Sequence, residues 1–572
     1  MRLARTLTGS LLTLMSAATL AAVPSSADLI LQGGHVRTPD GWAESIAVRA
    51  GVIVAVGDAA ALRGFKGAQT QVIDLQGATV IPGLHDVHVH PLFAGVSERQ
   101  CKVEQGKTMS AFLAAVKDCT SKAAKGTWIR GGQWDAPALG EPMSLEQLDA
   151  VTGDHPAYFE DSSGHSVWVN SAALRIARVE ETTANPPGGV IEHDEHGHLT
   201  GVLREDAGLE LLRGKIPKPD AATLRSALQW SHEEMLSHGL TSYTEASVGF
   251  TADFKSEMEN YKAFSAAKAV MPRATLCLTW GPDSADFERT LVERNLYRSE
   301  FVQPDCVKIF LDGVPTESHT AAMLEPYADT VAGRDDEAAR RGMLFVSQDV
   351  LNAAVTRFDA QGLTVKFHAA GDAAVRSGLD AIAAARSRNG FGGLMHNVGH
   401  CTFVSEQDIQ RARGMGATFE VSPYLFGPSS INEAIGSAIG PARMERVWPV
   451  REMLDAGALV VPGSDWSVVP SVNPWVGIEQ LVTRQRPGGS ADRFAPREAI
   501  SVQEAIDLFT VNAARQERTS DRLGKIAPGY WADLAVLEEN PYAIPATQLH
   551  DVHVRLTLVG GAVAYRATKG RH

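Results

Sequence analysis

The sequence predicts an α/β protein built on a (β/α)8 TIM barrel. It also predicts a β-sandwich domain made from both chain ends and an α/β insertion after barrel strand 1. Eight short β-rich runs alternate with Ala-rich helical stretches in the middle of the chain, which indicates a parallel barrel. Both ends of the chain instead show short apolar runs punctuated by glycine. The gap between the first two β-rich runs, about residues 92–239, is too long for a structureless loop.

Residues 1–27 (MRLARTLTGSLLTLMSAATLAAVPSSA) have the organisation of a secretory signal peptide. Arg2 and Arg5 precede an apolar stretch at 11–23, and small residues follow it, so cleavage is expected after Ala27. The alternative is a membrane anchor, but the stretch is short for a membrane span and contains Ser and Thr. We therefore expect a secreted or periplasmic protein with no membrane contact after signal cleavage.

Residues 28–80 and 523–568 are predicted to form the β-sandwich domain. Runs such as DLILQGGHVRT near the start and VRLTLVGGAVAYR near the end place glycines between alternating apolar residues. This pattern is typical of short strands joined by turns. Residues 81–522 then form the barrel, with the inserted subdomain at about 95–238.

The composition narrows the choice of partners. The formal net charge is −14, and no basic stripe with interleaved aromatic residues is present. Such a protein is not expected to bind nucleic acid or an anionic lipid surface. The expected partner is a small-molecule substrate, and a homo-oligomer remains open.

The five cysteines leave at least one thiol free, because their number is odd. Cys101 and Cys119 lie near each other in a polar segment, and an oxidising compartment would favour a disulfide between them. Cys277, Cys306 and Cys401 lie inside apolar runs, so we expect them to be buried thiols that pack as small hydrophobic residues.

Residues that can bind metal recur toward the ends of the predicted barrel strands. His88 and His90 end the first run, PGLHDVHVH, and alternation points both side chains to one side. The carboxyl ends of the strands surround the mouth of a barrel, where barrel enzymes keep their active sites. A lone H-x-H motif is weak evidence, but four later runs add Lys308, His368, His400 and Asp465.

These residues together can hold one or two divalent metal ions, with Zn2+ expected. A lysine ammonium cannot bind a metal, so Lys308 fits the set only if CO2 carboxylates it. A divalent ion lowers the pKa of bound water from about 15.7 to about 7. Asp465 is the expected catalytic base for that water. Asp372, four residues after His368, is expected to orient a ligand histidine, with a helix N-cap as the alternative.

Further motifs run through nearly the whole chain: GQWD (132–135), SGHSVWVNSAAL (163–174), GVIEHDEHGHLTGVLRE (189–205), KIFLDGVPTESHTAAMLEPYAD (308–329), HAAGDAAV (368–375), GSDWSVVP (463–470) and ADLAVL (532–537). With GLHDVHVH, they resemble the amidohydrolase superfamily, specifically its YtcJ-like (amidohydrolase-3) branch, which includes N-substituted formamide deformylases. The resemblance also implies the β-sandwich. It implies that His88, His90 and Asp465 bind the more buried metal, that His368 and His400 bind a second, and that carboxylated Lys308 bridges them.

Aromatic residues in the insertion and in loops after the later strands are candidates for substrate binding. Trp134, Tyr424 and Trp466 would favour an apolar or aromatic substrate group. The alternative, which applies to Trp134 in particular, is that such aromatic residues pack the insertion against the barrel. His165 and Arg443 match positions where the family keeps a histidine and an arginine, and they are the candidates for polar contacts.

The sequence therefore predicts an exported metal-dependent amidohydrolase that hydrolyses a C–N amide bond through a metal-activated water. One alternative is a deaminase, or a lactone or ester hydrolase, that uses the same site. Another is a non-catalytic barrel protein that binds a metal or a ligand, because the fold alone does not determine function.

Overall fold

Eight parallel strands form the central sheet of the computed structural model, and each overlaps one of the eight predicted runs. They pair in chain order, and most of their residues are buried, as expected for a sheet covered on both faces. The predicted fold class is confirmed. The strands are β8 (Leu84–Val89), β15 (Leu240–Val248), β16 (Arg273–Thr279), β17 (Val302–Phe310), β18 (Thr364–Ala369), β19 (His396–His400), β20 (Ala417–Val421) and β21 (Leu459–Pro462).

The structure describes residues 26–568, apart from 104–105, 163, 165, 187–188, 206–210, 213, 268–269, 283, 317 and 331–335. Residues 1–25 of the predicted signal peptide therefore lie outside the described residues. Within the described part of the chain, no helix combines the length and apolar character needed to cross a membrane.

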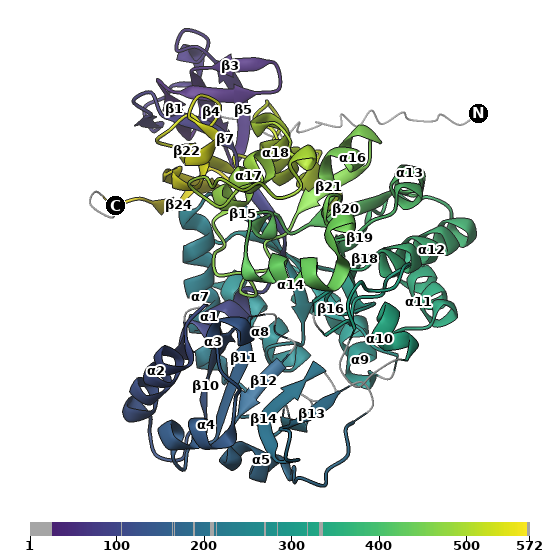
Figure 1. Ribbon diagram of the computed structural model, residues 1–572. Coiled ribbons are helices and arrows are strands. Elements are labelled where there is room, and N and C mark those ends of the chain that lie inside the picture. The colour runs from purple at the N-terminus through teal and green to yellow at the C-terminus, as the bar shows by residue number, and fades with distance from the viewer. Residues whose placement is uncertain are drawn as a thin grey trace, which may run out of the picture.

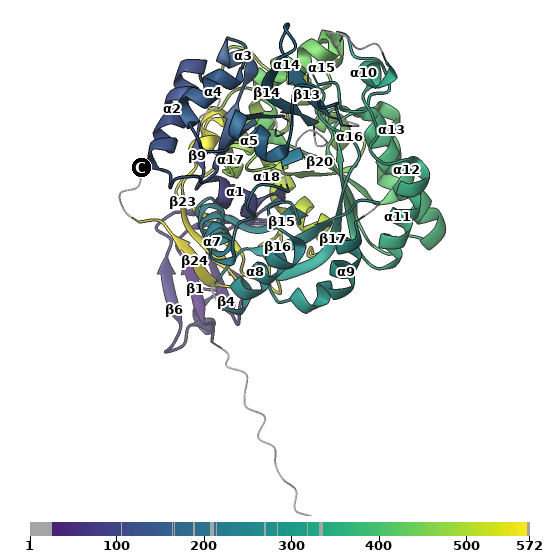
Figure 2. The same cartoon turned by 90° about the horizontal axis from the view of Figure 1, so that it is seen from below.

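Helices lie outside the barrel strands, as Figure 2 shows for α8, α9, α11 and α12. Several begin at a side chain that accepts a backbone N–H hydrogen bond, including Asp220, Asp253 and Ser405. The helices that follow the strands are α7 (Ala221–Ser237), α8 (Phe254–Ala266), α9 (Ala285–Glu293), α11 (Gln348–Ala360), α12 (Asp372–Asn389), α13 (Glu406–Met415), α16 (Val450–Asp455), α17 (Pro474–Thr483), α18 (Val502–Asp507) and α19 (Ala513–Gln516).

Both ends of the chain contribute to one pair of sheets (Figure 1). One sheet has the strand order β5-β4-β1-β6, and the other has the order β24-β23-β22-β7-β2-β3. Leu31, Val36, Val80, Leu534 and Leu556 lie in the apolar core between them. The strands are β1 (Leu29–Gln32), β2 (His35–Thr38), β3 (Gly41–Ala43), β4 (Ser45–Arg49), β5 (Val52–Gly57), β6 (Gln71–Asp74), β7 (Thr79–Pro82), β22 (Leu534–Leu537), β23 (Val554–Val559) and β24 (Ala562–Arg566).

The segment between β8 and β15 folds into a sheet of its own, with the order β13-β14-β12-β11-β10-β9. Its core includes Phe112, Phe159 and Trp168, all fully buried. It consists of β9 (Cys101–Lys102), β10 (Ile129–Trp134), β11 (Ala157–Asp161), β12 (Ser166–Val169), β13 (Val190–His193) and β14 (Leu199–Arg204), with α2 (Met109–Lys122), α3 (Ala136–Leu139), α4 (Leu145–Thr152) and α5 (Ser171–Ala177).

The barrel closes where the chain leaves β21 and meets β8. The Asp465 N–H donates to the His88 carbonyl at 2.8 Å, and the His90 N–H donates to the Trp466 carbonyl at 2.7 Å. Oδ1 of Asp86 accepts from the Ser464 N–H at 3.0 Å on the same seam. The first and last barrel strands are thereby joined through the residues that were predicted to bind metal.

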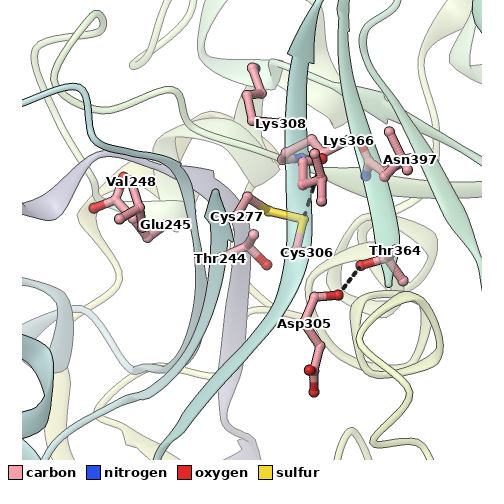
Figure 3. Close-up of a disulfide and its surroundings, with 12 residues drawn as sticks. Thr244, Glu245, Val248, Cys277, Asp305, Cys306, Lys308, Thr364, Lys366 and Asn397 are labelled. Atoms are coloured by element: carbon pink, nitrogen blue, oxygen red, sulfur yellow. Dashed lines mark hydrogen bonds between the residues drawn. A yellow bond between two sulfur atoms is a disulfide. The ribbon is translucent and has the colours of Figure 1, made fainter. Parts of the chain in front are cut away.

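The cysteine pairing differs in part from the prediction. Cys101 and Cys119 form a disulfide that joins β9 to α2, and Cys401 is a free, buried thiol. Cys277 and Cys306 were expected to be buried thiols, but they form a second disulfide (Figure 3). They face each other on the adjacent strands β16 and β17, a pairing that local sequence does not reveal.

A buried ion pair fastens the barrel to the two sheets formed by the chain ends. Arg273 begins β16, and its Nε and Nη2 donate to the two carboxylate oxygens of Asp533 at 2.7 and 3.2 Å. Asp533 directly precedes β22 and also accepts from the Gly560 N–H. The guanidinium lies 3.9 Å from the ring centroid of Trp531.

Replacing Arg273 with methionine should lower the free energy of unfolding by about 3–5 kcal/mol, because Asp533 would remain buried without its partner. Urea denaturation followed by circular dichroism measures the loss. Lys122→Met is the matched control, since Lys122 pairs with Asp118 on an exposed helix face and should change stability by at most about 1 kcal/mol. Equal effects of the two substitutions would contradict the prediction.

Candidate metal centre

Three predicted ligands meet at the seam that closes the barrel. Nε2 of His88 lies 3.6 Å from Oδ1 of Asp465, and Nε2 of His90 lies 3.3 Å from the same oxygen. One ligand atom from each residue lies within 4.8 Å of the others. Bonds of about 2 Å from each atom to one shared ion fit this spacing.

Lys308, His368 and His400 complete the cluster. Nζ of Lys308 lies 3.4 Å from Nε2 of His88. The His400 ring is next to both His88 and His368, with centroid separations of 4.8 and 4.3 Å. Nε2 of His400 is buried and has no hydrogen-bond partner among the described residues. Because an unpaired buried nitrogen is costly unless something binds it, this donor set fits a divalent metal.

Three of the histidines present their other ring nitrogen to a buried carboxylate. Such partners orient an imidazole and make it a better metal ligand. The pairs are His88 Nδ1 with Glu420 Oε1 at 2.5 Å, His90 Nδ1 with Glu245 Oε1 at 3.4 Å, and His368 Nδ1 with Asp312 Oδ1 at 3.2 Å.

Asp372 does not orient a histidine, contrary to the prediction. Its Oδ1 accepts from the Leu324 N–H at 2.7 Å. The N-cap of α12 is Gly371, so the alternative role was also wrong. Four residues after His368 the chain has already entered the first turn of α12, whereas Asp312 follows β17, the strand that pairs with β18. The residue beside His368 is therefore set by strand pairing and not by sequence distance.

A buried lysine also belongs to this network, and the sequence analysis did not identify it. Nζ of Lys366 pairs with Oε2 of Glu420 and donates to Oδ1 of Asn397 at 3.1 Å. Lys366 and Glu420 are both buried. Each is a single charged residue inside an apolar strand run (TVKFHA and ATFEV), and that pattern was the available signal.

The buried charges divide the histidines into two protonation states. Burial lowers the pKa of His88 well below its usual value, and the nearby Lys308 lowers it further. Burial also lowers the pKa of His90, but Asp465 and Glu245 outweigh that effect and bring it to about 9. Burial raises the pKa of Asp465, yet His88 and His90 more than compensate, and the net shift is downward. A metal bound by His90 would therefore have to replace a proton on its ring.

Two predicted substrate-binding aromatic residues are buried in packing contacts instead. Trp134 lies in the core of the insertion, where its Nε1–H donates to the Phe159 carbonyl at 2.8 Å. Trp466 is 5% exposed and packs against Trp230, with ring centroids 5.5 Å apart. Neither indole offers an open surface, because each ring fills the space between neighbouring elements.

The remaining substrate candidates have other partners or are not described. The Tyr424 hydroxyl donates to the Val472 carbonyl at 3.2 Å. The Arg443 guanidinium donates to the carbonyl of Ile439, at the end of the preceding helix, and to the carbonyls of Glu325 and Pro326, so it joins these two segments. His165 lies outside the described residues.

An aromatic residue that the sequence analysis missed lies beside the cluster. Phe250 follows β15, its ring centroid is 6.0 Å from that of His90, and its side chain is 46% exposed. It packs edge-on against Phe93, with a centroid separation of 5.4 Å. An exposed phenyl ring at this place offers an apolar surface to a molecule that enters the site.

Comparison with known proteins agrees with this geometry. A family described as the amidohydrolase family matches residues 71–565. The putative amidohydrolase YtcJ of Bacillus subtilis is 28% identical over 529 residues, which cover 91% of this chain and 96% of that protein. An N-substituted formamide deformylase of Arthrobacter pascens is 28% identical over 562 residues, covering 95% and 99%. The crystal structure of an uncharacterized metal-dependent hydrolase from Pyrococcus horikoshii OT3 superimposes with a TM-score of 0.71 at 20% identity, covering 91% and 99%.

Replacing Glu420 with glutamine should weaken divalent-metal affinity about 10–100-fold, because His88 would lose the carboxylate that orients it. Titration of metal-free protein with zinc against a chromogenic chelator measures the affinity. Glu479→Gln is the matched control, since Glu479 is also fully buried and holds a histidine, His550, that lies outside the cluster. A Glu420→Gln protein with unchanged zinc affinity would remove Glu420 from the centre.

Proposed function

The chain belongs to the amidohydrolase family, and from that premise we propose that it is an exported, metal-dependent hydrolase that cleaves the C–N bond of an amide. The convergence of four imidazoles, one carboxylate and one lysine at the mouth of the barrel carries this proposal. These side chains come from the ends of five different barrel strands, β8, β17, β18, β19 and β21. A packed core has no need for this arrangement, whereas a metal centre does.

We assign His88, His90 and Asp465 to one ion and His368 and His400 to a second, with Lys308 between them and Zn2+ as the expected metal. When bound, such ions supply positive charge that acidifies water and polarises a carbonyl group. Asp465 keeps its carboxylate ionised, since the net shift of its pKa is downward. It can therefore accept a proton from the attacking water and return that proton to the leaving nitrogen.

Lys308 has the property that carboxylation requires. Burial lowers the pKa of Lys308 to about 7, and the positive charge of Lys366 adds to the effect. A large share of the amine is then neutral at neutral pH, and its lone pair can attack the carbon of CO2. The product is a carbamate, formed with loss of one proton, and its carboxylate group would be able to hold a divalent ion. Lysine thus enters the donor set as an anion.

Export is supported by the two disulfides as well as by the predicted signal peptide. Cys101–Cys119 and Cys277–Cys306 would both require an oxidising environment to form and persist. A periplasmic or extracellular location provides that environment.

An amide substrate with a bulky apolar group fits the surroundings of the centre. Phe250 and Phe93 form an aromatic pair next to His90. Aromatic rings beside a small set of polar groups favour apolar ligands whose orientation the polar groups control. The N-substituted formamide deformylase that matches nearly the whole chain is consistent with this class of substrate.

The proposed activity is tested with zinc-loaded mature protein on a panel of N-acyl amides, esters, lactones and purine-like rings. We expect about one or two divalent ions per chain and release of carboxylate and amine from amides. Asp465→Asn should lower kcat about 10²–10⁴-fold, because the proton acceptor is lost. Asp408→Asn, at a buried aspartate outside the centre, should retain activity. Ammonia release from rings, turnover of esters alone, or full metal loading without any turnover would each reject the amidohydrolase assignment.

Phe250→Ala should raise KM for an amide with an aromatic substituent about tenfold, equivalent to about 1.4 kcal/mol of lost binding. The same substitution should leave KM for a compact dicarboxylic amide nearly unchanged. Phe391→Ala is the control, because Phe391 is also an exposed phenylalanine but follows α12, at the opposite end of the barrel. A wild-type preference for the compact substrate would show that the aromatic pair does not contact the substrate.

A further inference from the structure

We propose that the Cys277–Cys306 disulfide is a positioning cross-link for Lys308, so that a complete metal centre depends on the oxidation of two thiols inside the barrel. The inference rests on the proposed function in one respect, namely that Lys308 serves the metal centre. The cross-link itself touches neither substrate nor metal.

One cysteine of the disulfide, Cys306, lies two residues before Lys308 on the same face of strand β17. Cys306 precedes Lys308 by two residues in β17, so both side chains point to one side, about 6.6 Å apart along the strand. That side is the barrel interior, because Nζ of Lys308 reaches to 3.4 Å from Nε2 of His88 on β8. Cys277 and Cys306 are 0% and 3% exposed, as expected for interior positions. Figure 3 shows the cross-link between the neighbouring strands, with Lys308 farther along the strand that carries Cys306.

The same two strands also hold the backbone of Lys308. The Trp280 N–H donates to the Lys308 carbonyl at 2.9 Å. Thr279 is the partner of Lys308 in the strand register, as Cys277 is the partner of Cys306. The Thr279 hydroxyl donates to the Val248 carbonyl at 2.8 Å, which links the Thr279–Lys308 pair to strand β15. Strand β16 therefore holds Lys308 in two ways. The Trp280 N–H binds its backbone carbonyl, and the Cys277–Cys306 disulfide links the two strands two residues earlier.

The Cys277–Cys306 disulfide lies next to an irregularity in the hydrogen bonding between β16 and β17. The register between β16 and β17 shifts between Thr275 and Cys277. Such an irregularity leaves a residue unpaired and bends the strand. A covalent tie just before Lys308 holds the two strands together where this ladder is interrupted.

The chemistry needs an oxidant from outside the chain. The two thiols lose two electrons and two protons, and a dithiol–disulfide exchange partner takes them up and becomes a dithiol. Both sulfurs are buried in the finished structure, so the exchange takes place before the barrel closes. A chain folded in a reducing compartment would therefore have the barrel strands without the cross-link.

The second disulfide supplies a matched control. Cys101 and Cys119 are 18 residues apart and belong to the insertion, whereas Cys277 and Cys306 are 29 residues apart. In the chain-entropy model, loops of these lengths stabilise the fold by similar amounts. Loss of either disulfide should therefore lower Tm, but only loss of Cys277–Cys306 should alter the metal centre.

The experiment compares full-length C277A/C306A, C101A/C119A and wild-type protein, each exported and loaded with zinc. We expect folded C277A/C306A to hold about one ion fewer per chain, with kcat reduced about 10–100-fold and KM within about twofold of the wild-type value. C101A/C119A should keep the metal content and kcat of the wild type while its Tm falls. Equal metal content and kcat in folded C277A/C306A and wild type would overturn the inference.

Two additional measurements keep the result decisive. If C277A/C306A does not fold, C277V/C306A restores packing volume without a cross-link and must show the same loss of metal. Wild-type protein refolded with a phosphine reductant should also lose metal, and it should regain metal after a second unfolding and refolding in oxidising buffer, whereas the metal content of C277A/C306A should be the same in both buffers. Wild-type protein that binds no divalent ion would reject the proposed function itself, while an unaltered C277A/C306A centre beside an active wild type rejects the cross-link alone.

Discussion

The closure of the barrel between β8 and the chain after β21 is the constraint on which the rest of the site depends. Two backbone hydrogen bonds, Asp465 to His88 and His90 to Trp466, join residues almost four hundred positions apart. They place the two ends of the strand series so that His88, His90 and Asp465 face a common point. Asp465 and His400 have left-handed backbone conformations, with φ of +62° and +68°. Non-glycine residues keep such conformations only where the surrounding structure enforces them.

The second feature that shapes the site is the balance of charge inside the barrel. Burying an isolated charge costs several kcal/mol, so each charged group needs a partner. Glu420 is the buried carboxylate that contacts both His88 and Lys366. Burial lowers the pKa of Lys308 to about 7, Lys366 lowers it further, and the nearby Glu420 and Asp465 only partly oppose this shift. This shift is what the proposed carboxylation of Lys308 would require.

The outer parts of the molecule support this interior in different ways. Arg273 and Asp533 fix the barrel to the sheets formed by the chain ends. In the insertion, the side-chain amide of Gln133 reaches back to the Ser467 carbonyl at 2.9 Å, directly after Trp466. The insertion thus contacts the loop that carries the seam. Substitutions far from the ligands can affect the site through these contacts, since they hold the loop in which Asp465 lies.

The sequence by itself determined the eight-stranded barrel, the contribution of both chain ends, and the six residues that meet at the barrel mouth. Alternation and strand ends are local properties, so His88, His90, Lys308, His368, His400 and Asp465 could be placed without coordinates. Only the tertiary structure decided what lies beside them. Asp312 serves His368 in place of Asp372, Glu420 serves His88, Cys277 pairs with Cys306, and Trp134 packs in the insertion while Phe250 faces the site. All of these depend on which strands are neighbours and in what register, and that is set by contacts between segments distant in the chain.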